Sequence, residues 1–272
     1  MSQGILLRLN IALIAVTASL APVSVASAQV TTFATFSSLN SQKDVRLINS
    51  GTAATRTEDA RLFTSNSPSS TTVGSTQVKF SFLQSDLSPF VNGVVANFTL
   101  DAKVDKGAPA TTIGSVIVQP IVSGSMTFIS ANDITVTGPN FATHTYLAGS
   151  NLLTVTFDGF MSGGKNGSQT TLGGSTEADN TVSFTSDFLD FSDVSSGDLS
   201  ASFTALTTKL GLGANNSLAT FSATGGGQFS ADPAPKIIGL VPEPASWIMM
   251  VAGFAMLGVA LRRPVPLRLR SR

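Results

Sequence analysis

Hydrophobic and polar residues alternate along short stretches of this chain, as they do in strands that bury one face. The clearest stretch is residues 153–158, where Leu153, Val155 and Phe157 share one face and two threonines and an aspartate share the other. Similar patterns, or enrichment in β-branched and aromatic residues, predict further strands at residues 78–82, 94–100, 113–118, 125–129, 134–137, 182–184, 199–206 and 218–224.

Most of these predicted strands are bounded by Gly, Pro, Asn or Asp, the residues that tight turns require. Between them, no stretch of about 12 residues shows a convincing helical period. We therefore predict an all-β fold, an antiparallel β-sandwich of jelly-roll-like type, with a single-sheet barrel as the alternative. Two stretches rich in glycine, serine and threonine, residues 52–75 and 159–180, are expected to form long exposed loops.

The first 28 residues have the three parts of a secretory signal peptide. Arg8 gives the positive start, residues 9–20 form an apolar run, and Ala26 and Ala28 are the small residues that signal peptidase accepts. The apolar run is shorter than the roughly 20 residues of a membrane span, so cleavage after Ala28 is favoured over a membrane anchor. Export through the secretion machinery follows from this prediction.

The other end of the chain has a second apolar run. Residues 247–261 carry no charge and are followed at once by Arg262 and Arg263. A helix of this length, at about 1.5 Å per residue, is shorter than the roughly 30 Å hydrocarbon core. Extending it to residues 245–261 predicts a marginal transmembrane helix, with the arginines on the cytoplasmic side of the inner membrane. An ordinary stop-transfer anchor is one interpretation of this pattern.

A second interpretation comes from the order of Pro-Glu-Pro, short apolar helix and arginines. This tail resembles the PEP-CTERM sorting signal of Gram-negative bacteria, specifically the PEPxA-CTERM subtype. The matching residues are Pro242, Glu243, Pro244, Ala245, Trp247, Met249, Met250, Gly253, Phe254, Gly258, Leu261, Arg262 and Arg263. The resemblance implies that exosortase recognises the tail, cuts it near the Pro-Glu-Pro motif, and delivers the body to the cell surface or extracellular matrix.

Four segments follow from these patterns. They are a signal peptide at residues 1–28, a β-sandwich body at 29–232, a proline-containing linker at 233–240 and the sorting tail at 241–272.

The formal net charge of zero conceals an uneven distribution. Only 12% of the residues are charged, and six of the 16 basic residues lie in the two terminal segments. Residues 29–240 contain 10 basic and 15 acidic residues, so the body is mildly acidic. Nucleic acid is therefore not an expected partner, because its recognition needs a basic surface.

The composition also limits the chemistry that the body can perform. There is no cysteine, which excludes disulfides, thiolate metal sites and a cysteine nucleophile. A Ser-His-Asp triad would have to use His144, the single histidine, and the chain has no G-x-S-x-G motif. We therefore expect no enzymatic activity and no cofactor, and a secreted hydrolase is the least favoured reading.

Residues 187–198 contain the one acidic cluster of note. Asp187, Asp190 and Asp193 are candidate calcium ligands, because closely spaced carboxylates in a loop suit a hard cation. The segment lacks the glycine and glutamate of an EF-hand loop, so solvated aspartates around a turn are the competing interpretation.

The leading hypothesis is thus an exported, non-enzymatic surface or matrix protein that exosortase sorts and cuts. The alternative is a carbohydrate-binding module with exopolysaccharide as a partner. Sugar stacking favours exposed Trp or Tyr, and Trp247 lies in the tail while Tyr146 is the only tyrosine. Aromatic stacking therefore depends on whether any phenylalanine is exposed.

Overall fold

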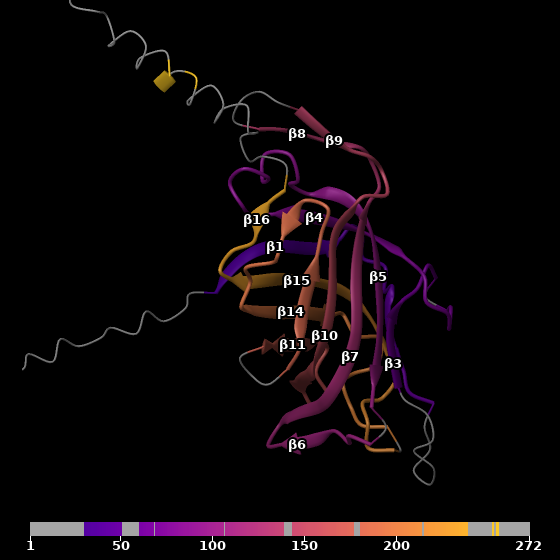
Figure 1. Ribbon diagram of the computed structural model, residues 1–272. Helices are drawn as coiled ribbons and strands as arrows, with labels where there is room; N and C mark the ends of the chain where they lie inside the picture. The colour runs from indigo at the N-terminus through magenta and orange to yellow at the C-terminus, as the bar shows by residue number, and fades with distance from the viewer. Residues whose placement is uncertain are drawn as a thin grey trace, which may run out of the picture.

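The computed structural model describes residues 30–50, 60–67, 69–105, 107–138, 143–176, 180–213 and 215–238, together with Ala252, Phe254 and Ala255. The described part of the body is all-β, which confirms the predicted class (Figure 1). The predicted signal helix at 1–28 lies outside the described residues. Of the predicted transmembrane helix at 245–261, only Ala252, Phe254 and Ala255 are described, and they are helical.

Sixteen strands form the described body. They are β1 (Thr31–Ser38), β2 (Val45–Ile48), β3 (Ala60–Thr64), β4 (Thr76–Phe82), β5 (Val94–Val104), β6 (Thr111–Ile113), β7 (Val116–Ser130), β8 (Ile134–Thr137), β9 (Thr143–Tyr146), β10 (Asn151–Gly164), β11 (Thr170–Ser175), β12 (Val182–Thr185), β13 (Leu189–Asp190), β14 (Ser196–Thr204), β15 (Phe221–Asp232) and β16 (Lys236–Ile237). Twelve of them join one antiparallel sheet, and β8–β9 and β13–β16 form two separate two-stranded sheets.

The pairings of the large sheet close on themselves. The closed path runs β1–β4–β5–β7–β10–β11–β14–β15 and returns to β1 through the β1–β15 pairing. The strands do not separate into two facing sheets, so the predicted sandwich is not confirmed. The closed path corresponds to the single-sheet alternative instead.

The long strands β5 and β15 each pair with two different strands along one edge, one strand on each half of that edge. On β5, residues 94–98 pair with β4 and residues 101–104 pair with β3. On β15, residues 221–223 pair with β2 and residues 226–231 pair with β1. The β1–β4 pair therefore connects one half of β5 to one half of β15, and the β2–β3 pair connects the other halves. We call the boundary between these two strand pairs the seam.

Hydroxyl groups bond to the backbone where this seam crosses the long strands. The Thr64 hydroxyl accepts the Leu100 N–H at 2.8 Å and donates to the Gly74 carbonyl at 2.7 Å. The Ser38 hydroxyl bonds in the same two ways to Gly225 of β15. Buried backbone groups need partners, and side chains supply them where neighbouring strands part.

The interior of the closed sheet is filled mainly by phenylalanine. Phe98 and Phe128 stack with ring centroids 4.8 Å apart, and Phe36 lies 4.9 Å from Phe128. Burying each such ring stabilises the fold by roughly 1.5–3 kcal/mol. The largest fully buried side chains of this core include Phe33, Phe80, Phe82, Phe98, Phe128, Phe157, Phe188, Phe203 and Phe229.

Different side chains close the two ends of the sheet. At the end where β1 begins and β15 finishes, the buried Leu87 and Val91 of the β4–β5 connection cover the core. At the opposite end, Asn49 and Asn215 exchange amide hydrogen bonds of 2.9 and 3.0 Å, and the buried Gln119 donates to the Ala108 carbonyl. These side-chain amides at the far end therefore have hydrogen-bond partners within the protein.

Most predicted strands are confirmed, with corrections at three places. Residues 159–180 are not a long loop, because they contain the end of β10 and all of β11. Residues 52–75 include β3, and the predicted strand at 113–118 is interrupted, because it contains the end of β6, a turn at Gly114 and Ser115, and the start of β7. The glycines of residues 159–180 lie where backbones approach closely: a Cβ on Gly159 would lie 2.2 Å from the Gly173 oxygen.

Candidate functional site

The segment that leads into the tail is held to the body. Residues 233–240 were predicted as a linker, and within them β16 pairs with β13 through Leu189–Ile237 and Asp190–Lys236. The Ile238 N–H donates to the Phe188 carbonyl at 2.9 Å. We call residues 235–238, with the contacts described here and in the next paragraph, the tail clamp.

Two further elements hold the tail clamp from other sides. The Gln84 amide, from the β4–β5 connection, donates to the carbonyl of the buried Pro235 at 2.5 Å. The Tyr146 hydroxyl of β9 donates to the Ile238 carbonyl at 3.4 Å. Ile237 packs against the hydrophobic core. The chain is therefore fixed by backbone pairing, side-chain hydrogen bonds and apolar packing up to Ile238.

Tyr146 connects the tail clamp to the core of this end. Its ring stacks on Phe188 with centroids 3.8 Å apart. Burial, and to a smaller extent the charge of Asp187, raises the pKa of Tyr146, so the phenol is neutral and can donate its hydrogen bond. His144 meets the edge of the same ring at 4.5 Å. The single histidine is exposed on β9 and contacts an aromatic ring there.

An exposed ion pair lies on the clamp. Lys236 donates to the Asp193 carboxylate, and this hydrogen bond raises the pKa of Lys236. Hydrogen bonds from Ser192, first from its backbone N–H and then from its side chain, lower the pKa of Asp190. Both groups are exposed, so water and salt screen these interactions and they contribute little to stability.

The three candidate calcium ligands have separate partners. The Asp187 carboxylate accepts the Asn151 N–H at 2.7 Å, Asp190 accepts the Ser192 N–H at 2.9 Å, and Asp193 pairs with Lys236. Among the described residues, no three acidic or histidine side chains gather into a metal-binding group. The structure therefore does not bring these three aspartates together as a cation site.

The end of the body that carries the tail clamp is acidic, and we call it the tail-proximal end. The described residues of this end include several carboxylates, and Lys236 of β16 pairs with one of them, Asp193. The acidic residues of its described connections are Asp86, Asp133, Asp187 and Asp193, and Asp190 lies in β13. The opposite end, with β6 in Figure 1, has Lys165, Lys209 and Asp105 in its described connections.

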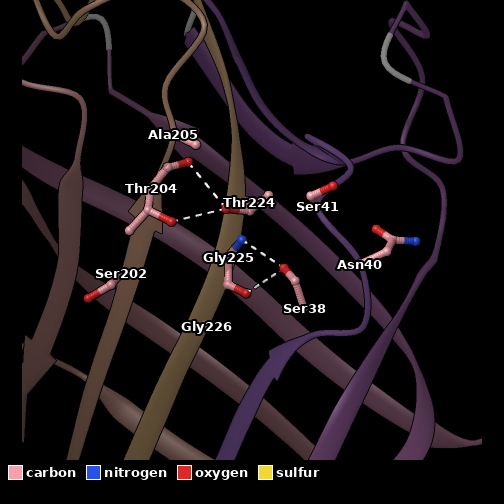
Figure 2. A pocket seen from close by; sticks show the side chains of 9 residues that line it. All are labelled: Ser38, Asn40, Ser41, Ser202, Thr204, Ala205, Thr224, Gly225 and Gly226. Atoms are coloured by element: carbon pink, nitrogen blue, oxygen red, sulfur yellow. Dashed lines mark hydrogen bonds between the residues drawn. The ribbon is translucent and has the colours of Figure 1, made fainter.

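A shallow groove lies on the outer surface, beside the seam (Figure 2). It has a volume of about 460 Å³ and is lined by the uncharged residues Ser38, Asn40, Ser41, Ser202, Thr204, Ala205, Thr224, Gly225 and Gly226. Two of its hydroxyls bond to each other, Thr204 and Thr224 at 3.0 Å, and Ser38 bonds to the Gly225 backbone. The groove offers hydrogen-bonding groups without charge.

An exposed aromatic ring lies on the same face of the sheet. Phe160 is 40% exposed, and its side chain lies over Gly173, where a Cβ would come within 3.3 Å of the ring. Gly173 pairs with Ser200, which lies two residues before the groove residue Ser202 on β14. Ser200 in turn pairs with Gln228 of β15. An uncharged polar surface therefore connects the ring and the groove.

The family comparison identifies the tail. The family model for the PEP-CTERM protein-sorting motif matches residues 240–263, at the C-terminus. This motif indicates export and sorting by exosortase. Neither the curated proteins nor the solved structures gave a match to this chain. Among the described residues, no helix is both long and apolar enough to cross a membrane.

Most predicted sorting residues lie outside the described part of the chain. They are Ala26 and Ala28 of the signal peptidase site, Pro242, Glu243, Pro244, Ala245 and Trp247 of the motif, and Arg262 and Arg263 of the basic stop. The family match covers the motif residues and both arginines. Sequence reasoning missed the tail clamp, although the apolar pair Ile237 and Ile238 behind the two prolines was a signal for a packed strand.

Proposed function

We propose that this protein is an exported, non-enzymatic surface or matrix protein that exosortase sorts and cuts through its C-terminal tail. The observation that carries the proposal is the sorting motif at residues 240–263. It begins two residues after Ile238, the last described residue of the body. A folded domain followed at once by a sorting signal fits the architecture of a sorting substrate.

The described body supports the non-enzymatic part of the proposal. A hydrolase of this chain would need His144 as its base, hydrogen-bonded to a nucleophile and to an orienting acid. His144 is exposed, and its described ring contact is with Tyr146. The groove of Figure 2 is lined by hydroxyl and amide groups, with no acid or base to activate them.

The test is the mass of the mature protein in a host with exosortase and in the same host without it. We expect an N-terminus at Gln29, and a C-terminus near the Pro-Glu-Pro motif only when exosortase is present. The variant Glu243→Ala should keep the full C-terminus. The matched control Asp105→Asn, an exposed acid at the opposite end of the body, should be cut as the wild type is. An intact Arg272 in both hosts would instead indicate a plain membrane anchor.

A second candidate function, binding of an uncharged glycan, is favoured by one observation. Phe160 is exposed on a face that also carries the uncharged groove and the side chains of Ser200 and Gln228. Sugars bind proteins by stacking their apolar faces on aromatic rings and by hydrogen bonding to polar neighbours. Neighbouring strands are about 4.8 Å apart, so the ring on β10 and the groove on β14 and β15 suit a chain of several sugars.

Gel retardation tests this candidate directly. Dextran in the gel should retard the purified protein, and alginate should not, because the residues that line the groove include no cation for an anionic polymer. Phe160→Ala should abolish the retardation, and Phe160→Tyr should retain it. Leu147→Ala is the matched control, since Leu147 is exposed directly after β9, at the tail-proximal end of the body. Equal mobility of all variants in both gels would exclude this function.

A further inference from the structure

We propose that the tail clamp stays closed while exosortase acts, so that the tail is cut alongside the folded tail-proximal end of the body. This inference rests on the proposed function and adds a geometric condition to it. The clamp then sets how far the Pro-Glu-Pro motif can extend from the body. The tail-proximal end of the body consequently contacts exosortase during cleavage.

The contacts of the clamp are the first reason. Its backbone is bonded to Phe188, its Pro235 carbonyl to Gln84 and its last described carbonyl to Tyr146. These three residues belong to three different connections and strands of the body. Opening the clamp breaks all of these bonds together and exposes the apolar side chain of Ile237. The closed state is therefore the ground state of the anchored precursor.

The length of chain beyond the clamp is the second reason. Pro242 is four residues after Ile238, and an extended chain reaches at most about 14 Å over four residues. With the clamp open back to Asp232, the reach becomes about 35 Å. A protease cleft holds several residues of extended substrate. When the clamp is closed, these residues take up most of the chain between Ile238 and Pro242. The closed clamp thus brings the body directly against the enzyme.

Charge is the third reason. The tail-proximal end has the carboxylates of Asp86, Asp133 and Asp187 in addition to the acids beside the clamp. Anionic lipid headgroups repel such a surface. The acidic end of the body therefore does not bind to the lipid surface, and exosortase can lie between the body and the membrane. We expect the part of exosortase that faces this end to be uncharged or basic.

Shortening the chain tests the proposal. Deleting Gly239 and Leu240 halves the reach to Pro242, and we expect processing to fall by about tenfold or more, as misplacement of a substrate does. Replacing the same two residues with Ser and Gly keeps the length and should keep the processing. Thermal unfolding of the body should be unchanged in both variants.

The decisive variant combines the deletion with an opened clamp. Ile237→Ser removes apolar packing, and Ile238→Pro removes the N–H that Phe188 accepts. Trypsin cleavage after the exposed Lys236 reports that the clamp has opened. In this background the deletion should be tolerated, because the released residues restore the reach. The control Ile113→Ser changes an exposed isoleucine far from the clamp and should not rescue the deletion.

Two results would overturn the proposal. One is normal processing of the shortened chain with the clamp intact. The other is a shortened chain that stays uncut even when trypsin shows an open clamp. Both are distinct from a failure of the proposed function, in which the wild-type tail and its Glu243→Ala variant have the same C-terminus.

Discussion

Ser38 and Gly225 form a reciprocal pair at the seam of the closed sheet. The Gly225 N–H donates to the Ser38 hydroxyl at 3.1 Å, and that hydroxyl donates to the Gly225 carbonyl at 2.7 Å. Gly225 lies between the part of β15 that pairs with β2 and the part that pairs with β1. A single side chain thus supplies both hydrogen bonds that a neighbouring strand would otherwise give.

The first prediction follows from this pair. Ser38→Ala leaves the N–H and carbonyl of Gly225 without their partner, and we expect the free energy of unfolding to fall by about 1–2 kcal/mol. Urea denaturation measures the change. Ser41→Ala is the control, because Ser41 lines the same groove and should have little effect. Equal stability of the two variants would show that water replaces the hydroxyl at no cost.

The second prediction compares two glycines of β10. A Cβ on Gly159 would lie 2.2 Å from the Gly173 carbonyl oxygen, whereas one on Gly164 would meet nothing within 4 Å. We expect Gly159→Ala to destabilise the fold by about 3 kcal/mol or more, because a backbone must move. Gly164→Ala should stay within about 0.5 kcal/mol of the wild type. Thermal melts of the two variants provide the comparison.

The third prediction concerns the amide pair at the far end. Asn215 is 2% exposed and exchanges hydrogen bonds with Asn49. Asn215→Ala removes both bonds and leaves the amide of Asn49 with fewer partners, which should cost about 2–3 kcal/mol. Lys209→Ala, at an exposed position of the same β14–β15 connection, is the control for a general effect on the loop. A loss of similar size in the control would attribute the effect to backbone conformation in this connection.

The fourth prediction is the pH dependence of the tail clamp. The pKa of Asp190 is lowered, so its contribution is present at neutral pH and is lost as pH falls through that lowered value. The pKa of Lys236 is raised, so its contribution is lost only as pH rises through that raised value. Protection of the Ile238 amide from hydrogen exchange should therefore be constant between about pH 5 and 9.

The control for this profile is Lys236→Ala. It should lower the protection slightly at neutral pH and remove the alkaline loss, because no ammonium remains to titrate. A wild-type protection that changes steeply near pH 7 would contradict the assignment, since neither group titrates there.

Local patterns of the sequence predicted strands such as β8 and β10, because their period of two depends only on which face is buried. They failed at residues 159–180, where glycine usually signals a loop. There the glycines permit close approach between β10 and β11, which depends on partners distant in the sequence. The closed path of strands also depends on long-range pairing, such as β1 with β15, that no local pattern encodes.

The sorting tail could be predicted because the motif is defined by short sequence elements that follow one another in a fixed order. Proline, glutamate, an apolar run and arginines are all visible in sequence, and the family match at 240–263 agrees with them. The tail clamp could not be predicted in the same way. Its partners, Gln84, Tyr146 and Phe188, lie about 50–150 residues away and meet Ile238 or Pro235 only in the folded body.

The direction in which the chain leaves the body has a mechanical consequence. β15 finishes at the tail-proximal end, and its two edges are bonded to β14 and to β1 and β2. Tension applied through the tail pulls along the axis of β15, across ladder hydrogen bonds that lie perpendicular to the strands. Once the two-residue β16 has given way, those bonds share the load in shear instead of breaking one at a time. A protein held by this tail would resist drag on its body.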